Sequence, residues 1–379
     1  MFRFIANEWQ RLAQDKWLLA SITWGPILLA VSVWWIFSQG TARALPVAVV
    51  DHQQSSLSRE LVRYLDASET LHVSTYFQNE HDAKRALSGS ELYAYVVIPR
   101  DFDRDIFLAN PPQVSVFYNN QYILVGKLVN SSVQRAIGTF DAQIQTIKQL
   151  SSGNSNLIGA LGKSVAVRTQ ITPLFNLNNN YAQFLVSAIV PAIWQIIIVV
   201  GTVLTLAMHK RIGTMDSWLE QGVVRCMAKT LACYIPIYAA LGVSFLWWFY
   251  AFFQWPMQGS YAVLIFAQFA TIIACMLVGA ICFFVPFDGA RALSFAGAFT
   301  APGFAFMGIT FPVTDMGALA QGWRSLLPIS HYIEAQVSQV SYGASVWQTL
   351  GHLTPMLGYL VLFVVLAKLA PKKIKGALV

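Results

Sequence analysis

Charge is what this sequence has least of. Charged residues make up 11% of the 379 positions, whereas an ordinary soluble domain has about 25%. Hydrophobic residues make up 56%, and the mean hydropathy is +0.52. Such an apolar chain is not disordered, and four cysteines are too few for a small disulfide scaffold. The composition therefore predicts a polytopic membrane protein.

Uncharged runs recur at lengths that suit a bilayer, whose hydrocarbon core needs about 20 apolar residues in a helix. The first run, Trp17–Phe37, is too long and too aromatic for a cleaved signal, and no small-residue cleavage site follows it. Two runs fit between Lys229 and Asp288, with a turn at 254–259. The sequence predicts six spans in all, of which the other three are Tyr181–Met208, a Gly- and Pro-rich stretch between Arg291 and Asp315, and 350–367.

The basic residues indicate the orientation of these spans. Thirteen of the 25 Lys and Arg residues lie outside the segment 39–180, and only Arg324 falls on the opposite side of the predicted membrane from the rest. By the positive-inside rule, the side that holds the other twelve basic residues is cytoplasmic, and both termini lie on that side. The net charge of +7 is thus a topology signal and not a nucleic-acid footprint. The twelve cytoplasmic residues are Arg3, Arg11, Lys16, Lys210, Arg211, Arg225, Lys229, Arg291, Lys368, Lys372, Lys373 and Lys375.

The segment 39–180 has the character of a soluble domain between the first two spans. It holds 12 basic and 11 acidic residues and is nearly neutral. Strand and amphipathic-helix patterns alternate from Pro46 to Tyr118, which is typical of a small α/β fold. From Gln121 to Leu150 we expect a long polar helix that can project away from the membrane. The fold class predicted is an α-helical polytopic membrane protein of six transmembrane helices with this inserted extracytoplasmic α/β domain.

Catalytic and metal-binding patterns are weak. The stretch 159–164 resembles a phosphate-binding loop, but Leu157 replaces its first glycine and no buried strand leads into it. His331 and Glu334 can share a helix face, yet two ligands are too few for a metal site. The sequence predicts no catalytic residue, no metal and no cofactor bound by this chain.

The N-terminal residues 1–16 predict an amphipathic helix lying in the cytoplasmic membrane interface. A plain membrane anchor explains the same pattern. The polar residues Arg3, Glu8 and Arg11 lie off the apolar face, which is formed by Phe2, Ile5, Trp9 and Leu12.

The loop 209–230 between the second and third spans is short and mixed in charge. It can form a helix after Gly213, on which Trp218 and Leu219 are expected to be exposed to the cytosol. Exposed apolar residues on a short cytoplasmic helix suit docking of a soluble partner.

Several stretches of the sequence, spread over nearly the whole chain, resemble one protein family. Gly213-Thr214-Met215-Asp216 aligns with a Gly-Thr-hydrophobic-acid motif that opens the coupling helix of ABC-2 type permeases, the membrane subunits of ABC exporters. Other stretches are similar to the same family, including drug-efflux-like members with a large periplasmic domain: Asn7–Leu12 and 15–26, Pro46–Asp51, Ser58–Val62, Tyr95–Phe102, Phe311–Val313, and Leu327–Tyr332 through Gly343.

The sequence departs from the family pattern in two places. Lys210 and Arg211 stand where relatives usually carry acidic residues, and Gly317 stands where relatives often have proline. Neither departure changes the class that the resemblance implies.

The resemblance implies two permease subunits, identical or paralogous, driven by separate cytoplasmic ATPase subunits that hold ATP and Mg. It implies that ATPase motion reaches the permease through the loop and the interface helix, and that the segment 313–348 folds into short re-entrant helices. The coupling residues expected are Gly213, Thr214, Met215, Asp216, Trp218, Leu219 and Glu220 with Trp9 and Arg11, and the gate residues are Pro312, Pro328 and His331.

We therefore expect a multi-pass protein of the bacterial inner membrane that exports a hydrophobic or amphipathic substrate from the cytoplasm or the membrane, with a periplasmic membrane-fusion adaptor as a further candidate partner. Gln195, Phe304, Phe306 and Met307 are candidates for the substrate path, although core packing accounts for them equally. The alternative is a membrane-anchored periplasmic receptor or adaptor without an ATPase. An intramembrane enzyme is disfavoured because the spans lack ionisable residues. The predicted boundaries are 1–16, 17–38, 39–180 and 181–379.

Overall fold

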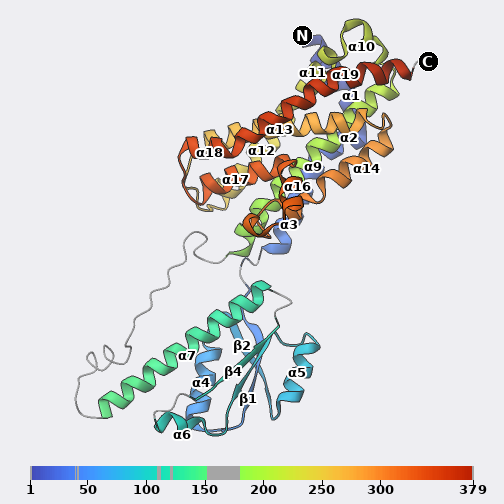
Figure 1. Cartoon of the computed structure of the whole chain (residues 1–379). Coiled ribbons are helices and arrows are strands. Elements are labelled where there is room, and N and C mark those ends of the chain that lie inside the picture. The colour runs from blue at the N-terminus through green and yellow to red at the C-terminus, as the bar shows by residue number, and fades with distance from the viewer. Residues whose placement is uncertain are drawn as a thin grey trace. The chain divides into compact units, whose positions relative to one another are not determined.

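The computed structural model describes residues 2–38, 40, 42–108, 112–119, 123–151 and 180–377. The chain forms two compact units, one made of Met1–Gly40 with Pro173–Val379 and the other of Thr41–Thr172 (Figure 1). The stretch 157–164 that resembles a phosphate-binding loop lies outside the described residues.

The Thr41–Thr172 unit contains a four-stranded sheet in the order β2-β1-β3-β4. The central strand β1 runs parallel to both neighbours, and β4 pairs with β3 in the antiparallel sense. Val49 of β1 lies opposite Val96 of β3 in this register. The strands are β1 (Leu45–Asp51), β2 (Leu71–Phe77), β3 (Ala94–Ile98) and β4 (Ser115–Tyr118).

Helices cover both faces of the sheet, with α4 and α7 on one side and α5 on the other (Figure 1). Successive residues of a strand point to opposite faces. Accordingly, Val47 and Val49 are buried towards α4 and α7, and Ala48 and Val50 towards α5. The helices are α4 (Ser56–Asp66), α5 (Glu80–Ser88), α6 (Phe102–Phe107) and α7 (Ile123–Ser151).

The long helix α7 differs from the polar helix that the sequence predicts. Val129, Val133, Ala136 and Phe140 recur every three or four residues and are buried in the core clusters of the sheet. Polar residues between them hide this stripe in the composition, but the spacing places all four on one helix face. The helix covers the sheet of its own unit.

The other unit is helical throughout its described residues. Its N-terminal part comprises α1 (Phe2–Gln14), α2 (Lys16–Ile22) and α3 (Trp24–Phe37). The remaining elements are α9 (Tyr181–Arg211), α10 (Asp216–Gln221), α11 (Val223–Ala232), α12 (Ile235–Leu246), η1 (Trp247–Phe252), α13 (Tyr261–Phe284), α14 (Gly289–Thr300), α15 (Gly303–Phe306), η2 (Val313–Asp315), α16 (Ala318–Ser325), α17 (Pro328–Val340), α18 (Val346–Leu353), η3 (Thr354–Tyr359) and α19 (Leu360–Gly376).

Four helical stretches among the described residues are long and apolar enough to cross a membrane: Tyr181–Arg211, Val223–Phe252, Tyr261–Phe284 and Val346–Gly376. The pair α2 and α3 makes a fifth if its 42° bend is counted within one span.

The fifth run of the sequence prediction does not form one long helix. It is divided at Pro302 into α14, of 12 residues, and α15, of four, because proline cannot donate to the preceding turn. Six full spans therefore stay a prediction.

The helix α9 lies at the centre of this unit and packs against α2, α3, α13 and α14. The crossing with α13 is close because Gly279 has no side chain: a Cβ there would lie 2.8 Å from the carbonyl oxygen of Val199. Gly297 of α14 has no such neighbour, since none of the described residues lies within 4 Å of a Cβ at that position.

Candidate functional site

The C-terminal end of α9 turns sharply into the loop that carries the predicted coupling motif. Gly213 has φ +71°, and its N–H donates to the carbonyl of Lys210, while the N–H of Thr214 donates to the carbonyl of His209. This pair of bonds is a Schellman motif, in which glycine supplies the left-handed conformation that ends a helix. The Gly-Thr pair of the motif therefore fixes where α9 stops and where α10 begins.

The short helix α10 presents a polar surface and hides its large apolar residues. Asp216, Ser217 and Glu220 are exposed. Met215 and Trp218 are buried, with Trp218 only 5% exposed. In Figure 1, α10 lies at the end of the helical unit where both chain termini are found.

The expectation that Trp218 is exposed is wrong. Its ring lies 5.2 Å from the imidazole of His209 and belongs to the core of the helical unit. Leu219 is half-buried against the same core. Burying an apolar ring against a neighbouring core lowers the free energy of the folded protein. A partner that binds α10 would therefore contact its exposed polar residues.

A chain of polar side chains links the turn before α10 to the N-terminal helix. Nε2 of His209 donates to Oε2 of Glu8 over 3.1 Å, because a carboxylate can only accept. Nδ1 of His209 meets the hydroxyl of Thr214 at 2.7 Å, and Nη1 of Arg11 donates to Oε1 of Glu8 at 2.7 Å. The chain Arg11–Glu8–His209–Thr214 thus joins α1, α9 and the coupling loop.

The electrostatics of this chain favour the ionised form of Glu8. Burial by itself would raise the pKa of the Glu8 carboxyl, but hydrogen bonds and opposite charge from His209 and Arg11 outweigh burial and hold the pKa below its usual value. Asp15 shows the same balance: burial raises its pKa, and hydrogen bonds from the Leu18 N–H and Arg211 lower it further than burial lifts it.

Lys210 and Arg211, the two departures from the family pattern, are both engaged within the chain. Nζ of Lys210 donates to the carbonyl of Phe287 and lies 4.3 Å from the centre of that ring. Nη2 of Arg211 lies 2.6 Å from Oδ2 of Asp15, which also caps α2. Both basic residues therefore connect the C-terminal end of α9 to other segments, Lys210 to Phe287 and Arg211 to Asp15.

The interface helix α1 exposes a different set of residues from the one predicted. Glu8 and Leu12 are buried and Ile5 is half-buried, whereas Trp9 is 50% exposed. A helix in the membrane interface turns some apolar side chains towards lipid, and Glu8 is held inward by its two basic partners. Of the two predicted coupling residues on this helix, Arg11 joins the buried chain and Trp9 does not.

Two of the three predicted gate residues, Pro328 and His331, lie one turn apart on α17, and the third, Pro312, lies before η2. Pro312 is exposed just before η2, and Pro328 is the buried first residue of α17. His331 is buried, and its Nε2 donates to the carbonyl of Ser325 over 3.0 Å. The segment 313–348 does form short helices, while its re-entry into the membrane stays a prediction.

The candidates for the substrate path separate into two groups. Oε1 of Gln195 accepts the N–H of Ile329 over 2.7 Å, so this buried glutamine ties α9 to the first turn of α17. Phe304 and Phe306 are half-buried against the core. Met307 lines a cavity of about 590 Å³ in the helical unit.

Glu8 and His209 are the residues of this site that the sequence did not point to. The spacing of α1 assigned Glu8 to a solvated face, and His209 was one of six scattered histidines. The available signal was the position of His209 four residues before Gly213, within one turn of the end of the second apolar run.

A comparison with protein-family models identifies the ABC-2 family transporter proteins, with residues 16–369 matched. A search of curated proteins and of solved structures gives no match. The matched range includes α2, the whole α9–α10–α11 junction and α17. The model covers most of the sequence, and the chain therefore belongs to the ABC-2 family of transporter proteins.

Proposed function

We propose that this chain is the permease subunit of an ATP-driven exporter, in which separate cytoplasmic ABC ATPase subunits push on α10. Members of the family are membrane subunits of transporters and normally work with such ATPase subunits. In this proposal α10 and both termini face the cytoplasm of a bacterial inner membrane, and the α/β unit lies outside. A second permease copy or paralogue completes the pathway.

The observation that carries the proposal is the two-sided character of α10. A helix that transmits force must be fixed on its inner side and accessible on its outer side. Met215 and Trp218 are buried beside His209, whereas Asp216 and Glu220 are exposed. The buried chain from Thr214 to Glu8 extends the fixed side to α1.

The exposed acidic residues also indicate the chemistry of the partner surface. Asp216 and Glu220 lie on the first and last turns of α10, and a basic surface complements them. Lys210 and Arg211 are engaged within the chain, so they do not neutralise this patch.

The first experiment measures ATPase association with purified protein. Asp216→Lys and Glu220→Lys are each expected to weaken binding of the ABC ATPase about tenfold, a loss of about 1.4 kcal/mol, without lowering the melting temperature. Asp315→Lys is the matched control, because Asp315 is an equally exposed aspartate in the short helix η2. Undiminished ATPase binding by both α10 variants, or ATP hydrolysis by the purified chain alone, overturns the proposal.

The second experiment tests the orientation of α10. The four native cysteines are buried and free, so Ser217→Cys introduces a single accessible thiol on α10. We expect a membrane-impermeant maleimide to label it in inside-out vesicles and not in spheroplasts. Ser131→Cys, on the exposed face of α7, should show the opposite pattern. Labelling of Ser217→Cys from outside the cell rules out the proposed coupling and favours the receptor alternative.

A further inference from the structure

Arg324 is the one basic residue outside 39–180 that the charge distribution places on the outer side, and the structure buries it. It lies in α16 and is 8% exposed. It lines the cavity of about 590 Å³, whose walls come from α9, η1 and the segment 307–352. A buried charged residue in a membrane protein is a candidate functional residue. The contacts of Arg324 indicate the kind of ligand that such a site would bind.

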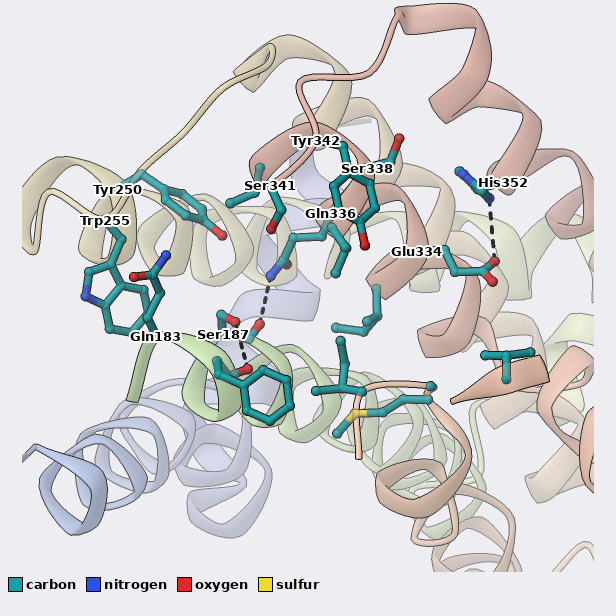
Figure 2. A pocket seen from close by; sticks show the side chains of 18 of the residues that line it. Gln183, Ser187, Tyr250, Trp255, Glu334, Gln336, Ser338, Ser341, Tyr342 and His352 are labelled. Carbon is teal, nitrogen blue, oxygen red and sulfur yellow. Dashed lines mark hydrogen bonds and ion pairs between the residues drawn. The ribbon is translucent and has the colours of Figure 1, made fainter. Parts of the chain in front are cut away.

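One end of the cavity is charged. Nη2 of Arg324 lies 2.6 Å from Oε1 of Glu334, and Nδ1 of His352 lies 3.7 Å from Oε2 of the same carboxylate. Figure 2 shows Glu334 and His352 pointing towards each other at this end. Arg324 and His352 thus flank a single carboxylate, with Arg324 nearest to one oxygen and His352 nearest to the other.

The guanidinium of Arg324 retains an unused donor. Its Nε is buried and finds no hydrogen-bond acceptor among the described residues. A buried donor left without an acceptor costs about 1–3 kcal/mol. The neighbour of this nitrogen is Gly308, where a Cβ would lie 3.6 Å from Nε. Because Nη2 already contacts Glu334, Nε is the donor of this guanidinium that an anionic oxygen can satisfy.

The opposite end of the cavity is aromatic. Tyr250 and Trp255 lie there, away from Glu334 and His352 (Figure 2). Ile309 and Val337 add apolar surface to the lining. The middle is bounded by Gln336, whose Nε2 donates to the carbonyl of Ser187 over 2.8 Å, which holds α17 against α9.

We propose that this cavity binds an anionic amphiphile, with its head group on Nε of Arg324 and its apolar chain against Tyr250 and Trp255. The volume lies within the roughly 300–1,000 Å³ that is typical of small-molecule sites. An anionic oxygen of the head group accepts from the unused Nε donor.

The identification of this ligand as the exported substrate rests on the proposed function, whereas its binding does not. Arg324 lies on the side predicted to be extracytoplasmic, which makes the cavity a late site on an export path. Binding can be measured on the full chain without any ATPase. A failure of the ATPase experiments therefore leaves the binding result unchanged, and the reverse also holds.

The experiment measures equilibrium binding to the purified full chain in detergent by native mass spectrometry. The probes are 1-oleoyl-lysophosphatidic acid, 1-oleoyl-lysophosphatidylcholine and glycerol 3-phosphate. We expect the first to bind at least about tenfold more tightly than either of the others. Equal affinity for the two lysolipids shows that the head-group charge is not recognised, and equal affinity for glycerol 3-phosphate shows that the chain is not. Either result overturns the proposal.

Two variants locate the site. Arg324→Lys keeps the positive charge and removes Nε, and should weaken lysophosphatidic acid binding about tenfold while leaving lysophosphatidylcholine unchanged. Arg291→Lys, at an exposed arginine of α14, is the matched control and should bind as the wild type does. Val337→Trp adds bulk to the cavity lining and leaves Arg324 and Glu334 themselves unchanged, so it decides the question if Arg324→Lys folds poorly. Undiminished binding by Val337→Trp overturns the assignment of the cavity.

Discussion

Glu8 and His209 are separated by 201 positions in the sequence, yet Oε2 of one lies 3.1 Å from Nε2 of the other, and both side chains are 1% exposed. The contact joins the N-terminal helix to the last turn of α9, four residues before Gly213. Because the pair is shielded from water, moving either helix alone would leave a buried group without its partner. The interface helix and the coupling loop should therefore move together.

The first prediction concerns the stability of this junction. Glu8→Gln removes the charge but keeps a side chain of the same size, and should lower the free energy of unfolding by about 1.5–3 kcal/mol, the range for a hydrogen bond to a charged group. Differential scanning fluorimetry of the purified protein measures the shift. Glu220→Gln makes the same chemical change at an exposed position and should stay within about 0.5 kcal/mol of the wild type. Equal effects of the two changes would show that the Glu8 contact contributes nothing.

The location of the coupling loop could be predicted from the sequence, but its inner contacts could not. Gly213 marks a helix end through its conformational freedom, which is a local property. The burial of Trp218 and the partner of Glu8 depend on segments distant in the sequence, and no local pattern reports such contacts. Arg324 is partly predictable. The distribution of basic residues along the sequence distinguishes it from the other twelve, but its place in the lining of a cavity depends on the folded structure.

The fold shows the same division. Parallel strands such as β1 and β3 are buried on both faces and form short apolar runs that are easy to recognise. The sequence predicts the helix α7 but not its apolar stripe, because polar residues separate the buried positions. The division of the fifth apolar run at Pro302 depends on backbone geometry that hydropathy does not measure.

The second prediction concerns pH. The pKa of Glu8 in the folded protein lies below its ordinary value of 4.5, so the folded state favours the ionised carboxyl. The stabilisation is complete above the ordinary value and is lost as the pH falls through the folded pKa. The difference in melting temperature between the wild type and Glu8→Gln should therefore be constant near neutral pH and shrink below about pH 4.5. A difference that grows on acidification would contradict the assigned direction.

The third prediction separates backbone strain from steric crowding. Nothing lies within 4 Å of a Cβ placed at Gly213 or at Gly297, but only Gly213 has a positive φ, of +71°. Gly213→Ala should destabilise the protein by about 1–2 kcal/mol, the cost of the left-handed conformation for a residue with a Cβ. Gly297→Ala, inside α14, should instead stabilise it by about 0.5–1 kcal/mol. Thermal unfolding of both variants measures the contrast, and an equal loss of stability in both would contradict the assignment of the Gly213 effect to its positive φ.

The last prediction decides between the two roles considered for Gln195. Its Oε1 accepts the N–H of Ile329, so Gln195→Leu leaves a buried N–H without an acceptor. The expected loss is about 1–3 kcal/mol in the free energy of unfolding, accompanied by faster hydrogen exchange at the start of α17. Gln183→Leu is the matched control, because Gln183 lies on the same helix and is half-buried at the cavity; it should leave the stability and the exchange of α17 unchanged. If Gln195→Leu alters transport while stability and exchange match the wild type, Gln195 contacts the substrate and its bond to α17 is incidental.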